Sequence, residues 1–264
     1  MIDRKGFLQL IGATAAAGLA AKVDAFAALG GKGAAHASKG HSKRTPTTSG
    51  NRWAMAIDLG KCVREKGCTR CMEACHATHN VPELPDAKHE VKWLWKEKFK
   101  YAFHEQDPEL VPEKFQKGPV PLLCNHCDSP ACTKVCPTQA TWKRKSDGVV
   151  MMDWHRCIGC RYCIAACPYG SRSFNYRDPR PFLKKIHEKF PTRTKGVVEK
   201  CTFCEERLAK GKRPACVEAC PAKALVFGDI EDPKSSVRKV LKRKFSVRRK
   251  PALGTGPQVY YLVT

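Results

Sequence analysis

The chain has 264 residues, of which 42% are hydrophobic and 28% are charged, and this composition is typical of a globular protein and excludes a disordered, low-complexity chain. The formal charge of +23 counts sixteen cysteines as neutral. Because thiolates bound to a metal are negative, the true excess of positive charge is expected to be smaller.

Residues 1–29 are predicted to form an export signal. Arg4 and Lys5 precede a mostly apolar run from 7 to 21, which is too short to span a bilayer. The stretch DRKGFL resembles a twin-arginine signal, with Lys5 in place of the second arginine. Folding before export would keep thiolates from forming disulfides outside the cell. Residues 30–50, rich in Gly, Ala, Ser, Thr, Lys and His, are predicted to be a flexible linker.

Three strand signals follow along the chain. WAMAIDL at 53–59 is a plausible strand, and Asp147-Gly148 lies between the apolar or β-branched stretches 141–144 and 149–152, which predicts a hairpin. ALVF at 224–227 is predicted to be a third strand. Together with the cysteines, these signals predict a repeated unit of ligand loop, short helix ending at Cys-Pro, and strand.

Two insertions separate these signals. Residues 81–121 are proline-rich, and Trp93 and Trp95 alternate with Lys92, Leu94 and Lys96, which is a weak strand signal. Residues 171–195 are basic and are predicted to form a surface loop. Residues 231–264 are predicted to be a basic C-terminal extension, whose run from 234 to 250 is either a solvated helix and tail or a surface for anionic lipid or an acidic partner. Nucleic acid is not an expected partner, because the chain has no recognition motif for it.

The sixteen cysteines form four groups of four. The third group reads C-x2-C-x2-C-x3-C-P, the bacterial ferredoxin pattern, in which the last cysteine binds the other cluster of a pair. The groups are Cys62, Cys68, Cys71 and Cys75; Cys124, Cys127, Cys132 and Cys136; Cys157, Cys160, Cys163 and Cys167; and Cys201, Cys204, Cys216 and Cys220.

This exchange of the last cysteine predicts four [4Fe-4S] clusters. Groups two and three are adjacent in sequence and are predicted to exchange their last cysteines with each other. Groups one and four are then predicted to exchange theirs, with groups two and three lying between them in the chain. The expected iron ligands are Cys62, Cys68, Cys71 and Cys220 for cluster 1; Cys124, Cys127, Cys132 and Cys167 for cluster 2; Cys157, Cys160, Cys163 and Cys136 for cluster 3; and Cys201, Cys204, Cys216 and Cys75 for cluster 4.

The predicted fold class is therefore α+β, with two bacterial-ferredoxin-like 2[4Fe-4S] modules. The module of groups two and three, at about 120–180, is inserted within the module of groups one and four, and the whole core covers 51–230. No catalytic residue is apparent, so the chain is expected to transfer electrons without a substrate site of its own.

Other uses of the cysteines are less consistent with the spacing. Zinc ribbons need paired knuckles, and cysteines that are close together in one loop rarely form disulfides with each other. A scaffold protein held together by zinc or disulfides is nevertheless the alternative function from another class. Haem c needs C-x2-C-H, which is absent. A [3Fe-4S] centre in one site is an open alternative. Four histidines beside the cysteines are expected to support or flank the sites rather than to bind iron: His76, His79, His126 and His155.

The segments CNHCDSPACTKVCPTQAT, DGVVMMDWHRCIGCRYCIAACPYGSRSFNY and CTFCEERLAKGKRPACVEACPAKALVFGD resemble the four-cluster subunits of the DMSO reductase, polysulfide reductase and NrfC-type nitrite reductase complexes. DLGKCVREKGCTRCMEACHATHNVP, EVKWLWKEKF and LGTGPQVYYL resemble more narrowly the DsrO subunits of DsrMKJOP complexes, and the similar subunits of Hme complexes.

The resemblance implies an electron-transfer subunit of a membrane-bound, quinone-linked respiratory complex of dissimilatory sulfur metabolism. It implies an NrfD-like integral membrane partner that handles a quinol, a multihaem cytochrome c and further subunits. The protein would then associate with the periplasmic or extracytoplasmic face of the cytoplasmic membrane. The alternative is the same role beside a molybdopterin oxidoreductase that reduces tetrathionate, polysulfide or DMSO.

Overall fold

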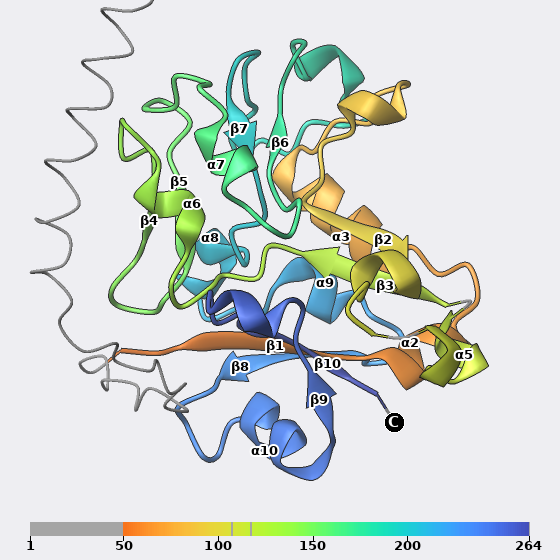
Figure 1. The fold of residues 1–264 in the computed structure, drawn as a ribbon. Helices are drawn as coiled ribbons and strands as arrows, with labels where there is room; N and C mark the ends of the chain where they lie inside the picture. The colour runs from red at the N-terminus through yellow and green to blue at the C-terminus, as the bar shows by residue number, and fades with distance from the viewer. Residues whose placement is uncertain (1–49, 107, 117, 264) are drawn as a thin grey trace, which may run out of the picture. The chain divides into compact units, whose positions relative to one another are not determined.

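The computed structural model describes residues 50–106, 108–116 and 118–263, so the predicted export signal and all but the last residue of the predicted linker lie outside it (Figure 1). A four-stranded sheet has the order β8-β1-β10-β9. β1 (Trp53–Asp58) pairs antiparallel with β8 (Leu225–Asp229) and parallel with β10 (Val259–Leu262), which also pairs antiparallel with β9 (Ser246–Val247). The strands predicted at 53–59 and 224–227 are confirmed, with shifts of one or two residues at their ends.

β1 is buried on both of its faces, which explains its nearly continuous apolar sequence. Ala54 and Ala56 pack against α10 (Ser236–Arg243) through its buried Val237, whereas Met55 and Ile57 face the main core. Small side chains suit the first face because they let a helix approach the sheet closely.

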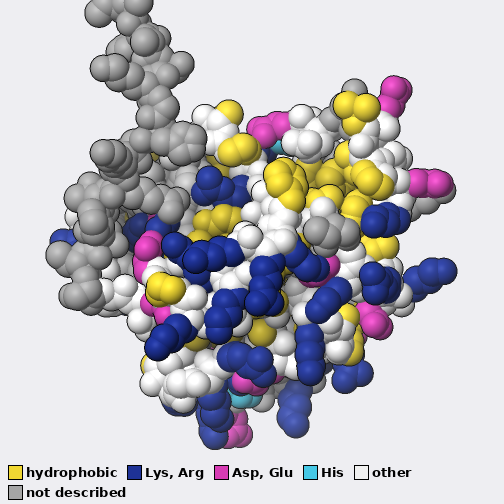
Figure 2. Space-filling model, turned by 90° about the horizontal axis from the view of Figure 1, so that it is seen from below, with side chains coloured by type: hydrophobic (Ala, Val, Ile, Leu, Met, Phe, Trp, Pro, Cys, Tyr) yellow, Lys and Arg dark blue, Asp and Glu magenta, His cyan; other side chains and the backbone are white. Residues whose placement is uncertain are grey.

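The C-terminal segment is part of this sheet. β10 lies between β1 and β9, and Val259 and Tyr261 have no exposed surface. Residues 231–264 are predicted from the sequence to be an extension outside the core, and that prediction does not include this pairing. The predicted helix in the basic run is present as α10, and Figure 2, viewed from below, shows Lys and Arg side chains gathered on the lower face of the molecule. Arg249 is instead buried and donates to the carbonyl oxygen of Ala102 at 3.0 Å.

The insertion at 81–121 forms a second sheet. β2 (Leu94–Lys98) pairs antiparallel with β3 (Pro119–Leu123), which confirms the strand predicted around Trp95. Short helices flank it: α2 (Leu59–Arg64), α4 (Phe99–Ala102) and α5 (Glu113–Gln116). Short 3-10 turns are η1 (Ala87–His89), η2 (Pro108–Leu110), η3 (Arg180–Phe182) and η4 (Pro251–Leu253). No helix within the described ranges is long and apolar enough to cross a membrane.

The cysteine segments repeat one local structure. The predicted hairpin is confirmed as β4 (Thr141–Lys143) and β5 (Val150–Met152), and β6 (Ser173–Phe174) pairs with β7 (Val198–Glu199). One-turn helices precede the three Cys-Pro pairs, as the sequence predicted: α6 (Ala131–Lys134), α7 (Tyr162–Ala165) and α9 (Ala215–Glu218). The remaining helices are α3 (Arg70–His79) and α8 (Glu205–Leu208).

The repeat extends to the backbone conformation. In each C-x2-C loop of groups two to four, the second spacer residue has a positive φ: 41° at His126, 70° at Gly159 and 56° at Phe203. The residue three places after the last cysteine of each of these groups also has a left-handed conformation. An example is Gly170, with φ 64°. A Cβ at Gly159 would lie 2.3 Å from the carbonyl oxygen of Gly196, so this loop needs glycine for space as well as for φ.

The prediction of a surface loop at 171–195 is wrong at both of its ends. Arg172 and Arg193 are buried. Arg193 forms an ion pair of 2.6 Å with Glu199, and neither side chain has exposed surface. Trp93 Nε1 also donates to Glu199 at 2.8 Å, and Arg193 donates to the carbonyl oxygen of Asn80 at 2.7 Å. Basic composition is a poor guide here because a paired or hydrogen-bonded arginine can be buried.

We expect Glu199→Ala to lower the free energy of unfolding by about 3–5 kcal/mol, because it leaves the Arg193 charge buried without its partner. The measurement is the urea concentration at which the holoprotein loses its visible absorbance. Glu83→Gln is the matched control, since its ion pair with Lys184 is exposed and should contribute at most about 1 kcal/mol. Equal midpoints for the two variants would contradict this role of the buried pair.

Candidate iron-sulfur cluster sites

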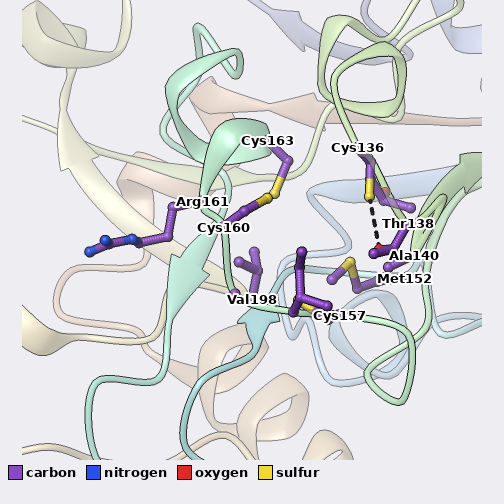
Figure 3. Close-up of a pocket in the computed structure, with 12 residues that line it drawn as sticks. Cys136, Thr138, Ala140, Met152, Cys157, Cys160, Arg161, Cys163 and Val198 are labelled. Atoms are coloured by element: carbon purple, nitrogen blue, oxygen red, sulfur yellow. Dashed lines mark hydrogen bonds between the residues drawn. The ribbon is translucent and has the colours of Figure 1, made fainter.

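Site 3 is a pocket whose lining includes four cysteines (Figure 3). Cys157, Cys160 and Cys163 come from the C-x2-C loop and from α7, and Cys136 comes from the other side, after α6. The Cys136 thiol faces the hydroxyl group of Thr138 at 3.7 Å. Burial raises the pKa of Cys136, but hydrogen bonds from the backbone of Thr141, from Thr138 and from the backbone of Ala140 outweigh it, so the net pKa is lowered.

Site 2 is a second pocket, and its lining includes Cys124, Cys127, Cys132 and Cys167. Burial is the main reason that the pKa of Cys127 rises to about 12, and the neighbouring cysteine thiols add to the rise. Such thiols cannot remain charged without a cation or a metal beside them.

Site 4 combines Cys75 of α3 with Cys201, Cys204 and Cys216. Burial raises the pKa of Cys75 well above its ordinary value, and the next causes are the charges of the other three thiols. Helix α3 packs against α9, which carries Cys216. All four cysteines are buried.

Site 1 combines Cys62, Cys68 and Cys71 with the distant Cys220. Burial raises the pKa of Cys71 to about 11; Lys96 opposes this rise, and the thiols of Cys62, Cys220 and Cys68 add to it. The five-residue spacer between Cys62 and Cys68 contains the end of α2 and a turn.

Backbone N–H groups point at several of these sulfur atoms. Cys220 Sγ accepts from the N–H of Ala224 at 3.2 Å, and Cys201 Sγ accepts from the N–H of Phe203 at 3.4 Å. Cys204 Sγ accepts from the N–H of Ala215 at 3.4 Å. Hydrogen bonds of this kind stabilise negative charge on sulfur and tune the potential of a bound cluster.

The thiols of neighbouring sites affect one another's pKa values, which indicates the order of the sites. Cys132 of site 2 affects the pKa of Cys163 in site 3, and Cys124 of site 2 affects that of Cys201 in site 4. Cys71 of site 1 likewise affects the pKa of Cys75 in site 4. The order of electrostatic contact is therefore site 3, site 2, site 4 and site 1.

Burial differs between the ends and the middle of this series. All cysteines of site 4 and three of the four in site 2 are buried, whereas three of the four in site 1 and in site 3 are only half-buried. Electron transfer to a partner requires a short distance between the two redox centres. The two outer sites are therefore suited to exchange electrons with partners, and the two inner sites are suited to pass electrons between the outer ones.

The four histidines beside the cysteines differ in their surroundings. His79 is buried, stacks on Trp93 with ring centroids 4.7 Å apart and contacts Glu206 at 3.2 Å through Nε2. His126 is stacked on Phe203, and burial holds its pKa well below the ordinary value. His76 contacts the carbonyl oxygen of Leu94, and His155 is exposed. His79 and Glu206 lie with Cys204 in a group compact enough to hold a metal ion.

Three cations that the sequence motifs do not single out lie beside the thiols. Lys96 lies near site 1, where it lowers the pKa of Cys62 against the effect of burial. Lys200 is fully buried and donates to the carbonyl oxygen of Cys201 at 2.7 Å. Arg172 donates to Cys132 Sγ at 3.0 Å. Their positive charge was visible in the sequence, but their burial was not.

The donor set fits iron-sulfur clusters. All sixteen cysteines are free thiols, and those of sites 2 and 3 line the two pockets. Thiolates are the ligands that [4Fe-4S] clusters use. Nine of the sixteen are buried, and bound iron would balance the negative charge of such thiolates.

The chain is similar in sequence to known iron-sulfur subunits. A family model described as "4Fe-4S dicluster domain" matches residues 118–180 and 184–230. The chain is 44% identical over 230 residues to "Hdr-like menaquinol oxidoreductase iron-sulfur subunit 1" of Archaeoglobus fulgidus, covering 80% of this chain and 82% of that protein. It is 39% identical to "Menaquinone reductase, iron-sulfur cluster-binding subunit" of Nitratidesulfovibrio vulgaris, covering 80% and 88%. It is 37% identical to "Protein NrfC" of Escherichia coli, covering 82% and 83%.

Proposed function

Because this chain belongs to the family of iron-sulfur electron-transfer subunits that includes NrfC and the iron-sulfur subunits of menaquinol oxidoreductases, we propose that it conducts electrons along four clusters in a quinone-linked membrane complex. The protein carries four [4Fe-4S] clusters and is not the catalytic subunit of its complex. The observation that carries the proposal is the series of four cysteine sites with half-buried ends.

The proposed iron ligands are the cysteines of sites 1 to 4 as grouped above. The pocket linings and the mutual charge effects of the thiols support this grouping. It corresponds to two ferredoxin-like modules, one inserted within the other. When bound, each cluster supplies a one-electron redox centre. The polypeptide holds the sulfur ligands, excludes water from the inner sites and directs N–H groups at the sulfur atoms.

The proposed partner is an integral membrane subunit that handles a quinol, with a multihaem cytochrome c and further subunits in the same assembly. The two relatives named for menaquinol or menaquinone, at 44% and 39% identity, support a quinone-linked complex. The basic lower face in Figure 2 would suit contact with an acidic surface.

Within this family, we propose the subunit type of the Dsr and Hme complexes of sulfur metabolism, exported to the outer face of the cytoplasmic membrane. The signal-like sequence at 1–29 supports export. A second candidate is a molybdopterin oxidoreductase complex. It is favoured by 36% identity over 242 residues to the "Arsenate respiratory reductase iron-sulfur subunit ArrB" of Shewanella.

The test is to purify the complex from membranes through a tag on this chain and to reduce its clusters with dithionite. We expect about sixteen irons and sixteen sulfides per chain, and four one-electron signals in a redox titration followed by electron paramagnetic resonance (EPR). A menaquinone analogue should reoxidise the clusters in the complex but much more slowly in the isolated chain. A molybdopterin subunit in the preparation would favour the second candidate, and zinc in place of iron would exclude both.

A further inference from the structure

We propose that the positive charge of Arg172 acts on the clusters of both site 2 and site 3 and raises the reduction potential of each. This inference rests on the proposed ligand groups, and it assigns a role to a residue that binds no iron. The observations that carry it are the burial of this arginine, its hydrogen bond with Cys132 of site 2, its contacts with two residues that line site 3, and the lack of a carboxylate partner among the described residues.

Arg172 is only 4% exposed. Its Nη2 donates to Cys132 Sγ of site 2 at 3.0 Å and to Thr141 Oγ1 at 2.9 Å, while its Nη1 faces Met152 Sδ at 3.9 Å. Thr141 in turn donates to the carbonyl oxygen of Met151 at 2.7 Å, so its oxygen is held in place to accept from the guanidinium. The side chain thus lies against the hairpin β4–β5.

The same guanidinium reaches site 3. Thr141 and Met152, which the guanidinium contacts, line the pocket of site 3, and Arg172 itself lines the pocket of site 2. Cys132 and Cys163 lie on α6 and α7, two helices that pack against each other, and belong to different proposed clusters. A planar group with several donors can reach both sites in this way, whereas a single ammonium group is less suited to it.

The charge of Arg172 has no carboxylate partner. Among residues 50–106, 108–116 and 118–263, no carboxylate is within ion-pair distance of it. Burying an arginine without a counterion is costly, so the thiolates of the two sites are its counterions. Each cluster gains one negative charge when it takes up one electron, and a nearby buried cation stabilises that reduced state.

The test compares reduction potentials in the purified complex, using dithionite as the reductant and EPR as the readout. In Arg172→Met we expect the reduction equilibrium to become at least tenfold less favourable for two of the four clusters, a fall of about 59 mV for each tenfold change in a one-electron step. The other two clusters should move less. Arg172→Lys, which keeps the charge, should give a smaller fall at the same two clusters.

Arg156→Gln is the matched control. It removes a positive charge next to the proposed ligand Cys157, but its side chain is 64% exposed and lies near Asp153, so solvent should screen it and the potentials should barely change. If Arg172→Met fails to bind iron, Arg172→Lys and Thr141→Val provide the test, because both disturb the guanidinium contacts. Unchanged potentials in the variants that load, or an equal fall at all four clusters, would overturn the inference. Fewer than four signals in the unmodified complex would instead contradict the proposed function.

Discussion

Replacing Cys75 by alanine should remove the cluster of site 4 and leave that of site 1, although Cys75 follows Cys71 by four residues on the same helix. The reason is that the Cys75 thiol lies with Cys201, Cys204 and Cys216 rather than with its neighbours in sequence. Iron should fall from about sixteen to about twelve per chain, and one EPR signal should disappear.

Cys71→Ala is the matched control on the same helix. It should abolish a different signal, the one that Cys220→Ala also abolishes, because burial and the charges of Cys62, Cys220 and Cys68 act on Cys71 in site 1. Loss of one and the same signal in Cys75→Ala and Cys71→Ala would show that each run of four cysteines binds its own cluster. The prediction that one module is inserted within the other would then be wrong.

Removing the iron should unfold the protein. Four of the helices beside the sites have only four residues each, α6, α7, α8 and α9, and helices this short are unstable by themselves in water. The sites also join segments that are far apart in sequence, such as α3 and the loop at 201–204, so their loss restores the conformational entropy of long loops. The hydrophobic core alone is not expected to hold these segments together.

The measurement is the radius of gyration before and after treatment with ferricyanide and EDTA. A compact chain of 264 residues is expected to have a radius of about 18 Å and an unfolded one about 57 Å. Tryptophan fluorescence, to which the buried Trp93 and Trp95 contribute, should shift toward that of exposed tryptophan. EDTA alone is the control, because it should leave intact clusters in place. An iron-free chain that kept its small radius and buried fluorescence would contradict the prediction.

Local patterns were sufficient for part of the secondary structure. The alternation of Trp93 and Trp95 with lysines predicted a strand at β2, and Asp147-Gly148 predicted the hairpin β4–β5, because turn geometry and side-chain period are properties of neighbouring residues. The same holds for the one-turn helices before each Cys-Pro. The left-handed residues of the loops were harder to foresee, since His126 and Phe203 occupy positions where Gly159 alone would suggest a positive φ.

The sequence by itself determined the chemistry: sixteen thiols in four groups, the third of which has the ferredoxin spacing, select iron-sulfur clusters, because ligand type and local reach are encoded within each loop. Tertiary structure alone decided which basic residues are buried and where the C-terminal segment lies. Arg172 and Arg193 looked like solvated residues of a basic loop, yet the first contacts thiols and the second pairs with Glu199. β10 (Val259–Leu262) pairs with β1 (Trp53–Asp58), although about 200 residues separate the two strands in the sequence. Burial and strand pairing depend on residues distant in sequence, so neither is written in a local pattern.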